Sequence, residues 1–198
     1  MLTLCMDTSH IFLALGLIRD DTVIARYQEK CWKKQSEEIF PSLISMCDGA
    51  GVKPEDIDQI VISRGPGSYT GVRIAMTIAK VFCAMADKPI YTISTLNLYA
   101  GLKKCRVVMD ARGKRVYTCT FENGNATSDE KAEFIVDLMP ELGSLEIIGD
   151  GNLVNGEDNW PDIIQNFLDL KDKWEKADNV HLVVPDYLKP ASSYLPQK

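Results

Sequence analysis

A glycine-rich stretch between two apolar runs holds the residues whose types and spacing could bind a ligand. It follows the apolar run 57–63, which predicts a buried strand, and precedes the apolar run 72–86, long enough for about four helical turns. Glycines between a strand and a helix N-terminus are typical of phosphate-binding loops, because free N–H groups there attract anions. The residues of this turn are Gly65, Pro66, Gly67, Ser68, Tyr69, Thr70, Gly71 and Arg73.

The spacing within the turn matches none of the common phosphate or nucleophile motifs. Thr70 stands where a P-loop has its second glycine, and the basic residue, Arg73, lies in the helix. The dinucleotide fingerprint also fails at Thr70, where its third glycine is required. Ser68 follows Gly67 directly, so the stretch is no nucleophile elbow. We therefore interpret it as a structural turn in which some positions adopt a positive φ, with Gly67 and Gly71 as candidates.

Three other kinds of residue bear on possible chemistry. The two histidines, His10 and His181, cannot form the paired motif of a zinc peptidase, so we expect no metal site, no peptidase activity and no catalytic residue. The six cysteines show no Cys-x-x-Cys spacing, which favours buried reduced thiols. The Arg73 guanidinium is a planar group of hydrogen-bond donors. It could bind an acidic side chain or a turn carbonyl of this protein, or an anionic ligand.

Five segments, taken in order, resemble the bacterial TsaB (YeaZ) family, which takes part in making threonylcarbamoyladenosine in tRNA. The likeness is strongest over residues 1–120 and extends over almost the whole chain. Gln35 stands where the family usually has histidine, at the start of a helix. The matching segments are Leu4–Ser9, Gln35–Pro41, Gly65–Ala75, Met109–Tyr117 and Pro185–Lys189.

The resemblance implies an actin-like ATPase fold and suggests candidate residues for a nucleotide-binding site. In actin-like ATPases the aspartate that ends the first strand helps to position metal and phosphates, and the hydroxyls after it contact phosphate. The corresponding residues here are Asp7, Thr8 and Ser9, although His10 stands where active kinases of this fold have glycine. The alternative is a structural role, in which Asp7 caps the N–H groups of its own turn. ATP or ADP is expected only within a larger complex.

Hydrophobic periodicity predicts the element order β-β-β-α-β-α-β, followed by a short helix, over residues 1–102. The first three strands are joined by short turns, so they form an antiparallel meander. With the resemblance, this order implies an α/β fold of the actin-like ATPase (ribonuclease H-like) type, with one full lobe, 1–102, and a truncated second lobe, 103–198. The predicted elements are strands 2–7, 11–18, 22–29, 57–63, 90–93, 105–110 and 115–121, and helices 36–47, with Ser36 as N-cap, 70–86 and 95–102.

Composition and charge limit the possible partners. The chain has 198 residues, 45% of them hydrophobic and 25% charged, which is typical of a globular protein. The net charge of −6 argues against a main tRNA-binding surface, because nucleic acids bind clustered basic residues. We interpret the basic clusters 103–106 and 112–115 as solvated strand edges or hairpins, or as minor tRNA contacts in a larger assembly. Without a basic leader or a run of about 18 apolar residues, we expect a cytoplasmic protein with no membrane segment.

The helix predicted at 70–86 is apolar nearly all round, so either it is buried in the monomer or one face meets another protein. The resemblance favours an interface, because TsaB-like proteins pair with their catalytic paralogue TsaD through helices of this lobe. Without that partner, we expect the same surface to form a homodimer. The predicted interface comprises Ile39, Leu43, Met46, Val72, Met76, Ala79 and Cys83.

The function implied by the resemblance is that of a noncatalytic scaffold. It would bind and activate a TsaD-like subunit that installs threonylcarbamoyl on the adenosine next to the tRNA anticodon. A TsaE-like ATPase would complete the assembly, and tRNA would be met only through the complex. The alternative is a nucleotide-binding phosphotransferase or hydrolase of the same fold. It requires a second glycine motif in residues 103–198, where Gly149-Asp150-Gly151 is the one candidate.

Overall fold

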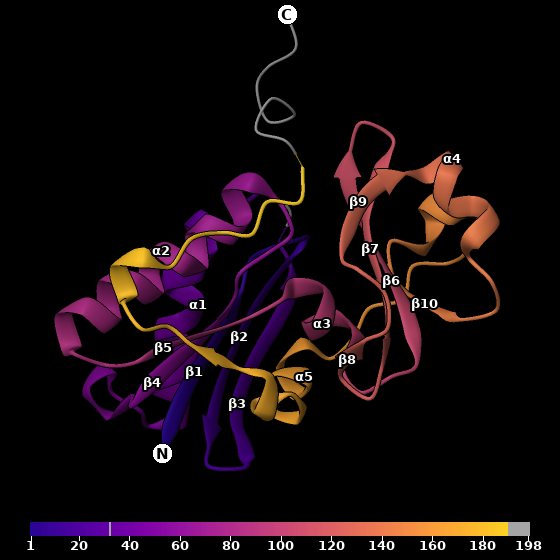
Figure 1. Cartoon of the computed structure of the whole chain (residues 1–198). Coiled ribbons are helices and arrows are strands. Elements are labelled where there is room, and N and C mark those ends of the chain that lie inside the picture. Colours follow the sequence, from indigo (N-terminus) through magenta and orange to yellow (C-terminus); the bar gives the residue numbers. More distant parts are fainter. Residues whose placement is uncertain (32, 190–198) are drawn as a thin grey trace, which may run out of the picture.

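Two β-sheets lying side by side form the protein, as seen in the computed structural model, which describes residues 1–31 and 33–189 (Figure 1). The first sheet has six strands in the order β11-β5-β4-β1-β2-β3. Strands β1, β4 and β5 are parallel, and β1, β2 and β3 form the predicted antiparallel meander. Its strands are β1 (Leu2–Asp7), β2 (Phe12–Arg19), β3 (Thr22–Lys30), β4 (Gln59–Ser63), β5 (Ile90–Ile93) and β11 (Glu175–Lys176).

The central strand β1 is buried along its whole length because both faces of the sheet are covered. Alternate side chains of a strand point to opposite faces. Leu4 and Met6 belong to the core beneath the helices, whereas Cys5 belongs to the core between the two sheets. Alternate side chains of β1 therefore belong to two different hydrophobic cores.

Helices α1 (Gln35–Ala50) and α2 (Tyr69–Ala86) pack on one face of the first sheet. The N-cap of α1 is Lys34, so the prediction of Ser36 is wrong. The helix begins one residue before Ser36 because Gln35 is buried, and its side-chain amide donates to the carbonyl of His10 at 2.8 Å. The helix ends at Ala50, beyond the predicted end at residue 47, and Gly51 caps it at a φ of 64°.

The second, smaller sheet has β6 and β7 as an antiparallel hairpin, with β10 parallel to β6. Helix α3 (Thr95–Ala100) and helix α5 (Ile163–Asp169) lie in the core that joins the two sheets. The predicted α/β fold, with a larger first lobe and a smaller second one, is thereby confirmed. The remaining elements are β6 (Cys105–Arg112), β7 (Arg115–Glu122), β8 (Asn125–Ala126), β9 (Lys131–Phe134), β10 (Glu146–Gly149), the helix α4 (Ile135–Leu138) and the 3-10 turns η1 (Pro54–Asp56), η2 (Met139–Glu141), η3 (Gly151–Val154), η4 (Lys171–Lys173) and η5 (Val180–Leu182).

Two parts of residues 103–198 return to the first sheet. Strand β11 pairs with β5, and α5 packs against β2 and β3. The division of the chain between residues 102 and 103 stays a proposal. Residues from the second half of the chain form part of the first lobe, and the two lobes share a hydrophobic core.

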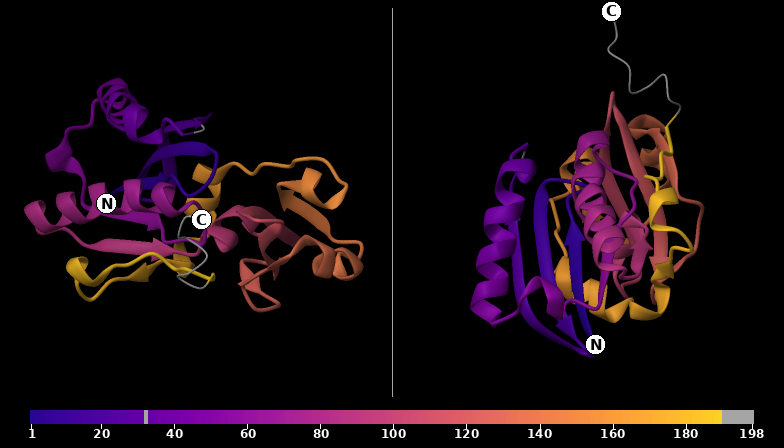
Figure 2. Two further views of the ribbon diagram at one scale, coloured as in Figure 1. Left: turned by 90° about the horizontal axis from the view of Figure 1, so that it is seen from above. Right: turned by 90° about the vertical axis from the view of Figure 1, so that its left-hand side faces the viewer.

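The segment 177–189, called the C-terminal strap here, crosses α2 on its way to the second sheet. In Figure 2 (left) it lies on the opposite side of α2 from α1. The ammonium of Lys80 on α2 donates to the carbonyls of His181 and Val183, at 3.0 and 2.8 Å. Further along, the Arg64 guanidinium binds the Asp186 carboxylate at 2.6 Å. These polar contacts hold the strap against the first lobe.

Of the described helices, α2 is long and apolar enough, by length and composition alone, to cross a membrane. The core helix of a soluble protein passes the same test. Six residues of α2 are buried and pack on the sheet, which is the arrangement of a core helix in an α/β fold.

Candidate functional site

The glycine-rich turn connects β4 to α2 and is shaped by close backbone approaches. Ser68 caps α2 by accepting a hydrogen bond from the Gly71 N–H at 3.2 Å. A Cβ on Gly67 would lie 2.4 Å from the Ser9 carbonyl oxygen, and a Cβ on Gly71 would lie 2.3 Å from the Thr8 carbonyl oxygen. The predicted positive φ in this turn is confirmed at Gly65, at 106°, and not at the candidates Gly67 and Gly71. Both residues are glycine because no side chain fits between two backbones.

The turn after β1 faces this glycine-rich turn and is fully buried. The Asp7 carboxylate accepts hydrogen bonds from the hydroxyl of Ser63 and, at 3.0 Å, from the N–H of Ser9. Its other oxygen accepts from the Tyr99 hydroxyl at 3.3 Å. Burial raises the pKa of Tyr99 well above its usual value, and the Asp7 charge raises it further. Asp7 thus performs the capping role foreseen as the structural alternative.

Thr8 and Ser9 tie the same turn to α2. The Thr8 hydroxyl donates to the Gly71 carbonyl at 2.7 Å and accepts from the Ala75 N–H at 3.1 Å. The Ser9 carbonyl accepts from the Ser68 N–H at 2.7 Å. None of the three predicted nucleotide-binding side chains is exposed in this arrangement. A nucleotide contact by Asp7, Thr8 and Ser9 stays a prediction.

A cleft of about 440 Å³ opens beside these turns, between the first lobe and the β6–β7 hairpin. His10 lies deep in it, with 7% of its side chain exposed, and its Nε2 lies 2.9 Å from Oδ2 of Asp150. The Trp160 ring packs on His10 with their centroids 5.4 Å apart. Because His10 belongs to the first lobe and Asp150 to the second, this pair links the two lobes.

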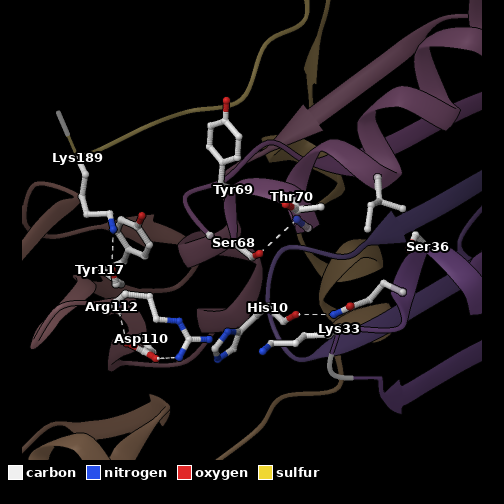
Figure 3. Close-up of a pocket in the computed structure, with 15 residues that line it drawn as sticks. His10, Lys33, Ser36, Ser68, Tyr69, Thr70, Asp110, Arg112, Tyr117 and Lys189 are labelled. Atoms are coloured by element: carbon white, nitrogen blue, oxygen red, sulfur yellow. Dashed lines mark hydrogen bonds and ion pairs between the residues drawn. The ribbon is translucent and has the colours of Figure 1, made fainter. Parts of the chain in front are cut away.

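Basic side chains line both walls of the cleft. Figure 3 shows Lys33 and Arg112 on either side of His10, and Lys189 at the opposite end. The Arg112 guanidinium pairs with the Asp110 carboxylate at 2.7 Å. Lys189 donates to the carbonyl of Ala111 at 2.5 Å. Burial lowers the pKa of Lys189 and the nearby Arg115 lowers it further, so cations crowd this wall.

Among the described residues, Arg73 contacts two tyrosines. Its guanidinium lies 3.8 Å from the Tyr69 ring centroid and 5.4 Å from that of Tyr187. The two rings are stacked, with centroids 5.5 Å apart. A hydrogen bond with Tyr69 raises the pKa of Arg73. This cluster could not be predicted from local sequence, because Tyr187 comes from the strap, more than a hundred residues away.

The predicted partner-binding stripes on α1 and α2 are largely core. Six of the seven residues are buried against the sheet, and the seventh, Leu43, is half-buried. The expectation that they form an exposed surface is therefore corrected, since each helix turns this stripe toward the sheet. The buried residues are Ile39, Met46, Val72, Met76, Ala79 and Cys83.

The opposite, outer sides of α1 and α2 form an exposed apolar surface with a hollow of about 870 Å³. Phe40 and Ile44 flank it from α1, with 54% and 59% of their surface exposed. Val81 and Met85 flank it from α2, with 54% and 84% exposed. We call these four residues, with the half-buried Leu43, Ile78 and Phe82 beneath them, the helix-pair face.

Over the described ranges, 1–31 and 33–189, no group of three or more histidine, cysteine, aspartate or glutamate side chains is placed to hold a metal ion. The six cysteines are free thiols, five of them buried.

Comparison with known proteins identifies the family. The family model described as TsaD, tRNA N6-adenosine threonylcarbamoyltransferase, matches residues 24–156. The Bacillus subtilis tRNA threonylcarbamoyladenosine biosynthesis protein TsaB is 36% identical over 135 residues, which cover 66% of this chain and 59% of the relative. The Escherichia coli protein of the same name is 30% identical over 179 residues, covering 82% of this chain and 75% of the relative.

Solved structures agree on the fold. YeaZ from Pseudomonas aeruginosa superposes with a TM-score of 0.68 at 19% identity, over 94% of this chain and 99% of that one. A second Pseudomonas aeruginosa structure, an uncharacterized protein with similarity to peptidase YEAZ, gives a TM-score of 0.77 at 20% identity, over 95% and 99%. Together, the sequence matches and the shared fold show that this chain belongs to the TsaB (YeaZ) family, whose curated members are tRNA threonylcarbamoyladenosine biosynthesis proteins.

Proposed function

We propose that this protein is a noncatalytic subunit in tRNA threonylcarbamoyladenosine biosynthesis that binds and activates a TsaD-like catalytic paralogue. The names of its relatives support the pathway, and the match to a TsaD family model supports a partner of related fold. A TsaE-like ATPase would complete the complex in the cytoplasm, and ATP or ADP would bind only within that complex.

The observation that carries this proposal is the helix-pair face. Four large apolar side chains, Phe40, Ile44, Val81 and Met85, are each more than half exposed around one apolar hollow. Exposed apolar patches of this kind mark protein-binding sites on soluble proteins. The occupant we propose is the TsaD-like subunit, and in its absence a second copy of this chain would cover the same face as a homodimer.

The arrangement of the polar residues favours this scaffold over an enzyme of the same fold. The side-chain oxygens of Asp7 and Thr8 form hydrogen bonds with other groups of the protein. The second glycine motif that a kinase would need is also closed. A Cβ on Gly151 would lie 1.9 Å from the Glu157 carbonyl oxygen, and Asp150 is engaged with His10. Both turns are therefore held by contacts within the protein.

The test is capture of the organism's TsaD-like protein by this chain, using Met85→Glu and a matched control. Met85 is 84% exposed on the helix-pair face, and Val136, on the second lobe, is 74% exposed. We expect Met85→Glu to fold normally and to lose both capture and self-association, because a buried charge is costly at an apolar interface. Val136→Glu should behave as wild type. Capture by Met85→Glu at wild-type affinity would place the interface elsewhere.

A further inference from the structure

The charge of the interlobe cleft differs in sign from that of the whole protein. The chain carries a net charge of −6. Yet the titratable residues lining the cleft include three cations, Lys33, Arg112 and Lys189, and one carboxylate, Asp110, which is already paired with Arg112. Lys33 and Arg112 are exposed, so they are accessible to a ligand larger than the cleft itself.

The cations line both walls of the cleft. Figure 3 shows Lys33 and Arg112 beside His10, and Lys189 over Tyr117 at the far end. They also come from three separate parts of the chain, namely the segment before α1, the end of β6 and the strap. Cations on both walls of the cleft suit a ligand with more than one negative charge.

Aromatic rings border the same cleft. Tyr69 lines it and is 46% exposed, and Tyr187, stacked on Tyr69, is 37% exposed. Arg73 completes the cluster, 3.8 Å from the Tyr69 ring. Proteins that bind single-stranded nucleic acid combine a basic groove for the backbone with aromatic and arginine side chains that contact the bases.

We infer that this cleft is an RNA-binding surface, in which Lys33, Arg112 and Lys189 contact phosphates of an unpaired RNA segment beside Tyr69 and Tyr187. The inference rests on the proposed function, which supplies tRNA as the substrate of the assembly, and it gives this chain a direct share in holding that RNA. The contact is auxiliary, because the chain as a whole is acidic.

Two other anionic partners fit the cleft less well. A mononucleotide needs its cations and free N–H groups at one point, but the turn that would cradle its phosphates, Asp7 to Ser9, is buried and internally bonded. An acidic protein surface would account for the cations but not for the adjoining tyrosine and arginine stack. RNA accounts for both.

The test measures binding of a labelled RNA hairpin with the sequence of a tRNA anticodon arm by fluorescence anisotropy, at several salt concentrations between about 50 and 200 mM. The variant is Lys33→Gln/Arg112→Gln. The control is Lys103→Gln/Lys104→Gln, which removes the same charge from lysines that pair with Glu146 and Glu122 on the second sheet. Urea unfolding verifies that both variants fold.

We expect the variant to bind roughly tenfold or more weakly at physiological salt, because each lost phosphate contact flattens the salt dependence of log K by about 0.7–0.9. The control should bind as wild type, and ADP or polyglutamate should not displace the hairpin. Equal losses in variant and control, an unchanged salt dependence in the variant, absence of binding by the wild-type chain, or displacement by ADP or polyglutamate would each refute the inference.

Partner capture is measured on the same variant so that the two proposals fail separately. Unchanged RNA binding by Lys33→Gln/Arg112→Gln, together with normal capture of the TsaD-like protein, would refute the RNA surface alone. Failure of the wild-type chain to capture that protein, with RNA binding and its loss in the variant intact, would refute the proposed function alone.

Discussion

Replacement of Gly71 by alanine tests how the two turns at the centre of the molecule are held together. The added Cβ would lie 2.3 Å from the Thr8 carbonyl oxygen and 3.0 Å from the Ser68 Cβ. The first of these atoms is backbone and is fixed by the bonds that Thr8 makes to α2. The turn after β1 must therefore move away from α2 to admit a single methyl group.

Overpacking of this kind costs about 1–3 kcal/mol. For a chain of this size, a loss of about 2 kcal/mol lowers Tm by roughly 4–8 °C. Urea and thermal unfolding, followed by circular dichroism, measure both quantities. The matched control is Gly49→Ala on α1, where a Cβ would meet nothing within 4 Å. Because alanine favours helix over glycine, this control should gain roughly 0.5–1 kcal/mol.

The two variants must therefore change stability in opposite directions. Wild-type stability in Gly71→Ala would show that the close approach between the turns is not what requires glycine. If Gly71→Ala kept its stability but lost nucleotide binding, the glycine-rich stretch would be a phosphate loop, and its structural interpretation would fail.

Two further predictions concern buried polar groups and thiols. Asp7→Asn should destabilise the fold by about 1–3 kcal/mol, because an amide has one acceptor oxygen for the three donors Ser9, Ser63 and Tyr99; unchanged urea unfolding would contradict this. Burial raises the pKa of Cys83 and Cys105 from the ordinary 9.0 to about 11. As the pH rises, these thiols therefore ionise in the unfolded chain before they ionise in the folded protein. Their contribution to stability is complete below pH 9.0 and is lost as the pH rises toward about 11. Urea unfolding at about pH 8 and pH 10 should therefore show a smaller loss of stability in Cys83→Ala than in wild type, and an equal loss would show that the thiol does not contribute.

Most of the first lobe could be predicted from the sequence because its signals are local. The strand at 90–93 is found at Ile90–Ile93, and the helix predicted at 70–86 is found at Tyr69–Ala86, capped by Ser68. In the second half, β10, α5 and β11 were missed. Asp162 is a typical N-cap residue for helix α5, and its side chain accepts a hydrogen bond from the Gln165 N–H. The helix is only seven residues long, however. Short elements that depend on tertiary packing leave little periodicity to read.

The helix-pair face shows that hydrophobic periodicity does not predict which side of an apolar helix is buried. On α1 and α2, apolar residues recur at helical spacing on both sides of the helix. Met76 and Val81 are equally apolar, yet the first is 4% exposed and the second 54%. Which side turns to the sheet depends on contacts with other elements, so the predicted stripes were the core side. The pairs His10–Asp150 and Tyr69–Tyr187 escaped prediction for the same reason, because they join residues far apart in the sequence.

The central claim, that this chain activates a catalytic partner through its helix-pair face, is tested most directly by reconstituted tRNA threonylcarbamoylation. The organism's TsaD-like and TsaE-like proteins are assayed with no added chain, with the wild-type chain, with Met85→Glu and with Val136→Glu. We predict that modification requires the chain, that Val136→Glu restores it fully and that Met85→Glu leaves it at the level without the chain. Full modification without the chain, or with Met85→Glu, would contradict the account.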